Sequence, residues 1–329
     1  MPNFFVRTVR GGDTETVHEV AAVVVDHAGA VRCSYGDADL VTPIRSAAKP
    51  FQALPLVEDG ALEALGIASE ELAVACGSHN SEEYQVAVVR GWLGRLGLQE
   101  HDLVCGPHRP LAKDLGFPCS DGTWEDVVLA VQSRVASNCS GKHTGMLSLA
   151  KFHGWELAGY GDADHPVQRN CLSVVSRLCD IDAGEVGSAV DGCGVVSWAV
   201  PLRALARGYA RLAPADGPAQ AVVSAMTTHP DMVAGKRRLC TALMQAYPGR
   251  VLAKVGAGGV YGATVLDEGL GIAVKVLDGD AKAASVALLT VLSDLGLDPQ
   301  EADTLARFAH PVILNTNFAV VGHYEAVRN

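Results

Sequence analysis

Residues 46–52 read SAAKPFQ and place a serine and a lysine three positions apart at the start of an apolar segment. Positions i and i+3 share one face of a helix, so Ser46 and Lys49 should meet if a helix begins near Ser46. Pro50 suits the first turn of such a helix, where its missing N–H removes no hydrogen bond. A serine hydroxyl becomes a nucleophile when a base takes its proton. Lys49 can be that base only if burial or a neighbouring cation lowers its pKa.

Two further motifs follow in the chain. The triplet SHN at 78–80 comes after the apolar run LAVACG, and KVG at 254–256 lies in a later strand-like run. In this order S-x-x-K, S-x-N and K-x-G form the signature of serine β-lactamases and penicillin-binding proteins, whose parts converge beside an antiparallel sheet. Each motif also has a purely structural alternative. Lys49 can snorkel to solvent after a helix cap, Ser78 can cap a helix from Glu82, and Lys254 can be an exposed strand residue.

Two cysteine-bearing stretches suggest a metal or thiol site. They are NCSGKHT at 138–144 and VDGCG at 190–194. Because zinc prefers thiolate and imidazole, donor chemistry alone nominates Cys139, His143 and Cys193, with a water as fourth ligand. The sequence has no C-x-x-C pair, however, and scattered cysteines are commonly buried as small apolar side chains. A thiol nucleophile at Cys139 with His143 as base is a further alternative.

The composition favours a globular enzyme of one or two domains. Of 329 residues, 49% are hydrophobic and 19% charged, which allows a large core. The formal net charge of −11 provides no basic surface for phosphate backbones, so nucleic acid is excluded as a partner and a small molecule is favoured. The N-terminal residues lack a signal-peptide pattern and no run of 18 apolar residues occurs, so we expect a cytoplasmic protein with no membrane contact. The nine cysteines are too scattered for a disulfide framework.

Hydrophobic periodicity predicts an α+β fold, with one antiparallel sheet built from both chain ends and a helical middle region. We treat residues 1–329 as a single domain, with the sheet from about 1–45 and 250–329 and helices over about 46–248. The expected elements are a strand at 4–9, a hairpin around DHAGA at 26–30, helices within 82–97 and 281–296, a strand entering a turn at 188–194, a second hairpin around LDEG within 250–279, and a last strand within 317–327.

Taken together, these motifs resemble the asparaginase II family, the Rhizobium-type L-asparaginases, which are similar in fold to serine β-lactamases and serine-dependent glutaminases. The stretches that carry the resemblance span nearly the whole chain: RSAAKPFQ, CGSHNSE, NCSGKH, DGCG, HPDMVAGKRR and KVGAGGVYG. The resemblance implies a penicillin-binding-protein-like fold and hydrolysis of L-asparagine to L-aspartate and ammonia through a serine acyl-enzyme. It assigns no role to HPDMVAGKRR.

The resemblance also implies roles for individual residues. The catalytic positions are the nucleophile Ser46, its activating Lys49 and a second pair, Ser78 with Lys254. The positions matching zinc ligands are Cys139, Lys142 and Cys193. Residues expected to contact or neighbour the substrate are Arg45, Asp191, Asn80 and His143. Lysine is a rare metal ligand because it must lose its proton, although bound zinc would itself lower that pKa.

Other functions remain open at this point. A glutaminase or a β-lactamase-like or peptidase-like acyl transferase would use the same three motifs, although the missing export signal disfavours a β-lactam substrate. A zinc-binding or amino-acid-binding protein without catalysis is the alternative outside the enzymes. We expect a homodimer, from the general prevalence of twofold oligomers and from the resemblance.

Overall fold

The computed structural model describes residues 3–107, 133–213, 217–299 and 302–328. The chain divides into two compact units. Met1–Ala47, Val200–Ala213 and Ala242–Asn329 form the first, here called the sheet unit, whereas Ala48–Ala199 and Pro214–Thr241 form the second, the helical unit. The sheet unit also includes residues 200–213 and 242–248, which the sequence placed in the helical region. The prediction of a single domain stays a prediction.

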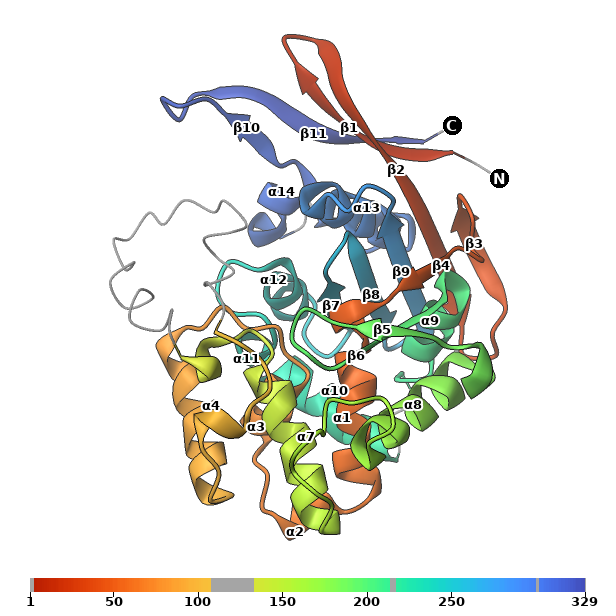
Figure 1. The fold of residues 1–329 in the computed structure, drawn as a ribbon. Helices are drawn as coiled ribbons and strands as arrows, with labels where there is room; N and C mark the ends of the chain where they lie inside the picture. Colours follow the sequence, from red (N-terminus) through yellow and green to blue (C-terminus); the bar gives the residue numbers. More distant parts are fainter. Residues whose placement is uncertain (1–2, 108–132, 214–216, 300–301, 329) are drawn as a thin grey trace. The chain divides into compact units, whose positions relative to one another are not determined.

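The sheet unit is built on one eight-stranded antiparallel sheet (Figure 1). Its strands are β1 (Phe4–Arg10), β2 (Asp13–Asp26), β3 (Val31–Tyr35), β7 (Val251–Gly256), β8 (Val260–Val265), β9 (Leu270–Val276), β10 (Val312–Leu314) and β11 (Val320–Arg328). The strand order is β10-β11-β1-β2-β9-β8-β7, and β3 also pairs with β2. Because β1 pairs with β11 and β2 with β9, both chain ends complete the sheet. The predicted α+β class and sheet origin are therefore confirmed.

The first predicted hairpin is confirmed, but the second is wrong in detail. In the first, the Asp26 carboxylate accepts a hydrogen bond from the Ala30 N–H at 2.9 Å, which closes the turn between β2 and β3. The segment 250–279 forms three strands rather than two. Gly258 and Gly259 adopt φ values of +77° and +73°, so a second tight turn divides the first apolar run into β7 and β8.

Helix α9 (Leu202–Ala210) lies directly on the sheet because two strand glycines leave room for it. A Cβ atom at Gly262 would lie 2.0 Å from the Tyr209 ring, and one at Gly271 would lie 1.9 Å from the Ala206 carbonyl oxygen. This close approach explains why residues 200–213, within the predicted helical region, belong to the sheet unit. The predicted helix within 281–296 is confirmed as α13 (Ala281–Asp294), which also contacts the sheet and is followed by α14 (Asp303–Ala309).

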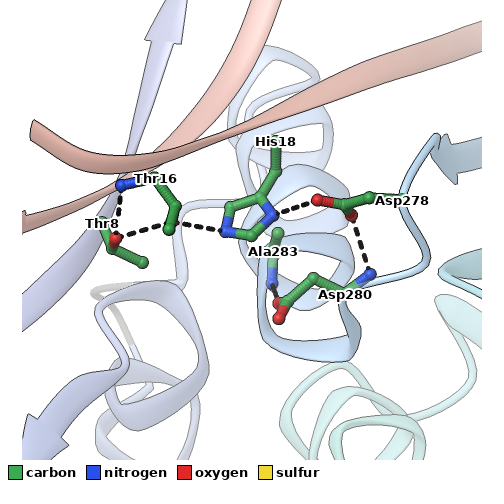
Figure 2. A network of polar contacts seen from close by, with 6 residues as sticks. All are labelled: Thr8, Thr16, His18, Asp278, Asp280 and Ala283. Atoms are coloured by element: carbon green, nitrogen blue, oxygen red, sulfur yellow. Dashed lines mark hydrogen bonds and ion pairs between the residues drawn. The ribbon is translucent and has the colours of Figure 1, made fainter.

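A polar network ties strands β1 and β2 to the loop before α13 (Figure 2). His18 Nδ1 lies 2.6 Å from the Asp278 carboxylate, and His18 Nε2 lies 3.1 Å from the Thr16 hydroxyl. The Thr16 hydroxyl also lies 2.6 Å from that of Thr8. Asp280 caps α13 by accepting a hydrogen bond from the Ala283 N–H at 2.7 Å. These contacts have a structural role, because they fix the long β1–β2 ribbon at the base of α13.

The helical unit contains most of the helices. They are α1 (Lys49–Glu58), α2 (Ala61–Ala64), α3 (Ser69–Ala75), α4 (Glu83–Arg95), α7 (Ser140–His153), α8 (Pro166–Cys179), α10 (Pro218–Thr228) and α11 (Pro230–Val233). Short 3₁₀ turns are η2 (Glu100–Asp102), η4 (Arg134–Ala136) and η5 (Ala183–Glu185), and strands β5 (Gly187–Val190) and β6 (Val196–Pro201) form a hairpin. Helix α12 (Leu239–Ala246) spans the boundary between the two units.

Helix α7 begins against the end of α3. A Cβ atom at Gly141 would lie only 2.4 Å from the Val74 carbonyl oxygen, so glycine permits this crossing. The predicted helix within 82–97 and the strand and turn within 188–194 are confirmed as α4 and as β5 with the turn after it. The part of the predicted helical region at 108–132 lies outside the described residues. None of the described helices combines the length and apolar character needed to cross a membrane.

Candidate active site

Lys49 is the first residue of α1 and is almost completely buried, with 1% of its surface exposed. A short 3₁₀ turn, η1 (Arg45–Ala48), leads into α1, and Pro50 occupies the first helical turn as predicted. The Lys49 Nζ donates to the Ser78 Oγ at 3.0 Å, to the Asn138 carbonyl oxygen at 3.3 Å and to the Gly77 carbonyl oxygen. The alternative of a snorkelling Lys49 is therefore wrong.

The pKa of Lys49 is lowered from its usual value of 10.5, chiefly because burial disfavours its charged form. The positive charge of Lys142 lowers this pKa further, whereas the neighbouring sulfurs of Cys139 and Cys193 act to raise it. The balance increases the fraction of neutral amine at moderate pH. This is the protonation state that a lysine base requires.

The loop after α3 presents Ser78 to the Lys49 amine. A Cβ atom at Gly77 would lie 2.7 Å from the Met232 carbonyl oxygen, and the Ser78 N–H donates to the Val233 carbonyl oxygen at 2.7 Å. Ser78 is 3% exposed. Glu82, not Ser78, is the N-cap residue of α4, so the capping alternative for Ser78 is wrong.

Asn80 fastens this loop to the segment whose role the sequence did not assign. Its side chain is 2% exposed and accepts a hydrogen bond from Arg238 Nη1 at 2.9 Å. The Asn80 amide also donates to the Glu82 carboxylate and to the Lys236 carbonyl oxygen, each at 3.1 Å. The segment HPDMVAGKRR therefore holds the Ser78 loop in place through its hydrogen bonds to Asn80. A substrate contact for Asn80 stays a prediction.

Two thiols and an amine meet at the start of α7. The Lys142 Nζ donates to the Cys193 Sγ at 3.0 Å, and Cys139 hydrogen bonds with Cys193. Cys193 lies in a tight turn that Asp191 closes, because the Gly194 N–H donates to the Asp191 carbonyl oxygen at 2.8 Å. The hydrogen bond from Cys193 holds the pKa of Cys139 well below its usual value, and the positive charges of Lys49 and Lys142 act in the same direction.

This cluster fits the donor preference of zinc. Two sulfur donors and an amine lie together, and the lowered pKa of Cys139 favours the thiolate that binds metal. The pKa values of Cys193 and Lys142 are raised, so both would have to lose a proton when zinc binds. No group of three His, Cys, Asp or Glu side chains suited to a metal occurs within the described ranges, so the third protein ligand would have to be Lys142. The set of Cys139, His143 and Cys193 nominated by donor chemistry alone is therefore not assembled there.

His143 lies one residue beyond Lys142 but takes part in a different set of contacts. It is 0% exposed, and its Nδ1 lies 2.6 Å from the Tyr160 hydroxyl, which itself accepts a hydrogen bond from the Val104 N–H at 3.0 Å. Burial holds the pKa of His143 well below its usual value, and the charges of Lys142 and Lys49 lower it further. A neutral His143 bonded to Tyr160 gives no support to the alternative in which Cys139 is the nucleophile and His143 is its base.

The sheet unit holds the remaining predicted catalytic residues. Ser46 is half-buried in η1, where the Tyr209 hydroxyl donates to the Ala47 carbonyl oxygen at 2.7 Å. Lys254 is 0% exposed on β7, so the alternative of an exposed strand residue is wrong. A Cβ atom at Gly256 would lie 2.6 Å from the Ile44 carbonyl oxygen, so the end of β7 packs against the turn that carries Ser46.

Arg45 precedes Ser46 with a φ of +49°, a left-handed backbone conformation that is uncommon for a residue other than glycine. Such outliers persist where the surrounding structure holds them, often next to reacting groups. Asp191 lies in the turn beside Cys193 and is half-buried.

The structure thus brings several predicted residues together within one of the units. In the helical unit these are Lys49, Ser78, Cys139, Lys142 and Cys193. Sequence reasoning missed His79, Tyr160 and Arg238, whose hydrogen bonds position the helical-unit residues. Two of them lay in stretches already selected from the sequence, His79 between Ser78 and Asn80 and Arg238 at the end of HPDMVAGKRR.

Several solved structures align with most of the chain at low sequence identity. Mglu, in its native form in the presence of 4.3 M NaCl, aligns at 17% identity over 91% of this chain and 66% of its own, with a TM-score of 0.40. An octameric penicillin-binding protein homologue from Pyrococcus abyssi aligns at 13% identity over 86% of this chain and 74% of its own, with a TM-score of 0.36. A β-lactamase from Mycobacterium bovis aligns at 17% identity over 84% of this chain and 93% of its own, with a TM-score of 0.36. The chain spans slightly less than two thirds of the Mglu chain.

No curated protein matches this sequence. The family model described as L-asparaginase II matches residues 6–326. The match extends from β1 to β11 and includes every residue of the candidate site. The chain therefore belongs to the L-asparaginase II family.

Proposed function

We propose that the protein is an L-asparaginase, an amidohydrolase that converts L-asparagine to L-aspartate and ammonia. Membership of the L-asparaginase II family supports this reaction class. The structural observation that carries the proposal is the buried Lys49 amine, with its lowered pKa, 3.0 Å from the Ser78 hydroxyl. A neutral amine beside a hydroxyl is the arrangement that Ser–Lys acyl transfer needs.

In the first step, Ser46 attacks the carbon of the side-chain amide of asparagine. Ser46 precedes Lys49 by three residues, and the turn η1 runs directly into α1. The spacing of three residues supports this pairing, because side chains at i and i+3 share one face of a helical turn. Lys49 takes the hydroxyl proton as the new C–O bond forms. Backbone N–H groups of the turn would stabilise the negative oxygen of the tetrahedral intermediate.

In the second step, the C–N bond breaks and ammonia leaves. The leaving nitrogen needs a proton, and Lys49 now carries the one taken from Ser46. The hydrogen bond from Lys49 to Ser78 provides a route for this proton, with Ser78 passing its own hydroxyl proton onward. The resemblance assigns Lys254 to this step as the partner of Ser78. Water then hydrolyses the ester, again with Lys49 as base, and aspartate is released.

Recognition of the amino-acid end of the substrate uses two charged residues. We assign the substrate α-carboxylate to Arg45, because guanidinium binds carboxylates through two hydrogen bonds. We assign the α-ammonium to Asp191, which lies in the turn beside Cys193. Asn80 and His143 complete the surroundings, and their buried hydrogen bonds suggest that they shape the site.

Zinc is part of the proposal but not of the nucleophilic step. Cys139, Lys142 and Cys193 would hold the ion. When bound, it would supply positive charge that helps to position a substrate oxygen. We also propose that the protein is cytoplasmic and forms a homodimer. Size-exclusion chromatography with light scattering would test the oligomeric state.

One assay separates this function from its alternatives. Ammonia release is measured from L-asparagine and L-glutamine, and a chromogenic β-lactam is tested in parallel, for the wild type and for Ser46→Ala. The proposal expects release from asparagine that Ser46→Ala abolishes. Turnover of glutamine alone would indicate a glutaminase, and turnover of the β-lactam alone would indicate the β-lactamase-like alternative. A protein that binds zinc or asparagine and turns over none of the three would be a binding protein.

A further inference from the structure

His79 lies between Ser78 and Asn80 and is 0% exposed. Its Nδ1 accepts a hydrogen bond from the Ser81 N–H at 3.1 Å, so Nδ1 carries no proton. Its Nε2 lies 2.9 Å from the Ser140 Oγ. The Ser140 hydroxyl donates to the Val135 carbonyl oxygen at 2.7 Å, so towards His79 it acts as an acceptor. The contacts on both sides therefore select the neutral Nε2–H tautomer.

Ser81 makes a second connection between the same two segments. Its backbone has a φ of +70°, a conformation that is unfavourable for serine unless the surroundings hold it. Two contacts do so here: its N–H donates to His79, and its hydroxyl donates to the Ala136 carbonyl oxygen. The loop that carries Ser78 is thus tied to the last residue of η4 and the first residue of α7 through uncharged hydrogen bonds.

The two ends of this connection are functional. At one end, Ser78 precedes His79 and bonds to Lys49. At the other, Ser140 directly follows Cys139 and lies two residues before Lys142. Lys49 also bridges these segments, through the Gly77 and Asn138 carbonyl oxygens. During the proposed reaction, however, Lys49 gains and loses a proton, whereas the bond from His79 to Ser140 keeps the same donor throughout.

We propose that His79 is a positioning residue that couples the Ser78–Lys49 pair to the thiol–amine cluster of Cys139, Lys142 and Cys193. The kinetic part of this inference rests on the proposed function. The structural part does not, because it states only that the bond from His79 to Ser140 sets the position of both segments. His79 has no place in the chemical steps and acts through Ser78 on one side and Cys139 on the other.

The test compares variants that keep different halves of the imidazole. Asparagine places its amide near the position of Nδ1, so His79→Asn keeps a group near Ser81 and loses the donor to Ser140. Glutamine reaches the position of Nε2, so His79→Gln keeps that donor. Ser140→Ala removes the acceptor. His165→Asn is the matched control, because His165 also accepts a hydrogen bond from the N–H two residues later, at 3.1 Å, away from the site.

Two readouts are needed for each variant. The first is kcat and KM for asparagine: kcat should fall about 10- to 100-fold in His79→Asn and in Ser140→Ala, as for other residues that orient catalytic groups. His79→Gln should recover most of this loss, and KM should change by less than about threefold in all of them. The second is the rate at which iodoacetamide alkylates Cys139, read by peptide mass spectrometry in metal-free protein. This rate should rise about tenfold in His79→Asn and Ser140→Ala.

The double variant His79→Asn/Ser140→Ala decides whether the bond is the connection. If it is, the double variant matches Ser140→Ala in both readouts, because the bond from His79 to Ser140 is already lost in Ser140→Ala, together with the bond from Ser140 to the Val135 carbonyl oxygen. Additive losses, or Cys139 alkylation unchanged in folded His79→Asn and Ser140→Ala, would overturn the coupling. A wild type without asparaginase activity would refute the proposed function instead, and the alkylation rates would still test the coupling. Circular dichroism of each variant establishes whether it is folded. If His79→Asn does not fold, Ser140→Ala, which lacks the acceptor, is compared with His79→Gln, which keeps the donor.

Discussion

The Nζ of Lys49 lies 3.0 Å from the Oγ of Ser78, and both side chains are buried, at 1% and 3% exposure. Burial raises the free energy of the protonated amine, and nearby Lys142 adds like-charge repulsion. The charge of Lys49 also lowers the pKa of Cys139, so Lys49 links the second serine of the site to the thiol–amine cluster. This position makes Lys49 the residue on which the proposed chemistry depends.

The pH dependence of activity should report the protonation of Lys49. Only the neutral amine can take the Ser46 proton, so kcat/KM should rise with pH as Lys49 deprotonates. The pKa of Lys49 is lowered from 10.5, so this rise should be centred below that value. Measurements of kcat/KM across the pH range in which the protein stays folded would check it.

Lys49→Arg tests the same point by substitution. Arginine keeps the positive charge and does not deprotonate in this range, so activity should fall by at least about 10³-fold at every pH. Lys151→Arg is the control, because Lys151 is exposed near the end of α7. Substantial turnover by Lys49→Arg at neutral pH would rule out a lysine base.

Ser78→Ala should lower kcat by about 10²- to 10⁴-fold, because the leaving ammonia would lose its proton donor. KM should change little, because no substrate-binding contact is assigned to Ser78. Steady-state kinetics with asparagine measure both constants. Ser148→Ala removes a similarly buried hydroxyl, which donates to the Thr144 carbonyl oxygen at 2.9 Å inside α7, and should leave kcat unchanged. Equal losses in the two variants would mean that the effect of Ser78 is structural.

Local spacing in the sequence predicted much of the fold and the site. The apolar run of β2 and the turn residues after it were sufficient for the first hairpin, and the Pro50 signal placed the start of α1 correctly. The turn at Gly258 and Gly259 was missed because the apolar run seemed continuous on both sides of it. A glycine within an apolar run can lie inside a strand or in a tight turn between two strands, and the observed φ values distinguish the two.

The contacts that support the site were less predictable because they join distant parts of the chain. Asn80 and Arg238 are 158 residues apart, and His79 and Ser140 are 61 apart. No periodic pattern encodes such pairs. Donor chemistry alone also favoured His143 over Lys142 beside the cysteines, whereas the structure directs His143 to Tyr160 and Lys142 to Cys193. The rotation of α7 decides between these neighbours, and a short sequence stretch does not specify it.

Zinc binding should depend on the thiol–amine cluster. We expect about one zinc ion per chain by elemental analysis, and Cys193→Ser should lose it, because a hydroxyl is a poor ligand for zinc. Added zinc should raise the unfolding temperature of the chelated wild type and not that of Cys193→Ser. Cys33→Ser is the control, since Cys33 is also a half-buried cysteine but lies on β3 in the sheet unit. Full zinc content in Cys193→Ser would place the ion elsewhere.

Gly141 and Gly91 make a matched pair for the crossing of α7 and α3. Gly141→Ala would bring a Cβ atom within 2.4 Å of the Val74 carbonyl oxygen. It should therefore destabilise the protein by about 1–3 kcal/mol and lower kcat, because the start of α7 must move. Gly91→Ala, in α4 with no atom within 4 Å of its Cβ position, should stabilise by about 0.5–1 kcal/mol. Denaturant unfolding measures both, and a neutral Gly141→Ala would contradict the close packing.

The most direct measurement is the identity of the residue that becomes acylated. Asparagine is mixed with the wild type, and the reaction is quenched in acid within the first turnovers, before the ester is fully hydrolysed. Peptide mass spectrometry then locates the aspartyl ester. The account predicts the ester on Ser46, and predicts none when Ser46→Ala is treated in the same way. An ester on another residue, or a thioester on Cys139, would contradict it, as would undiminished turnover by Ser46→Ala.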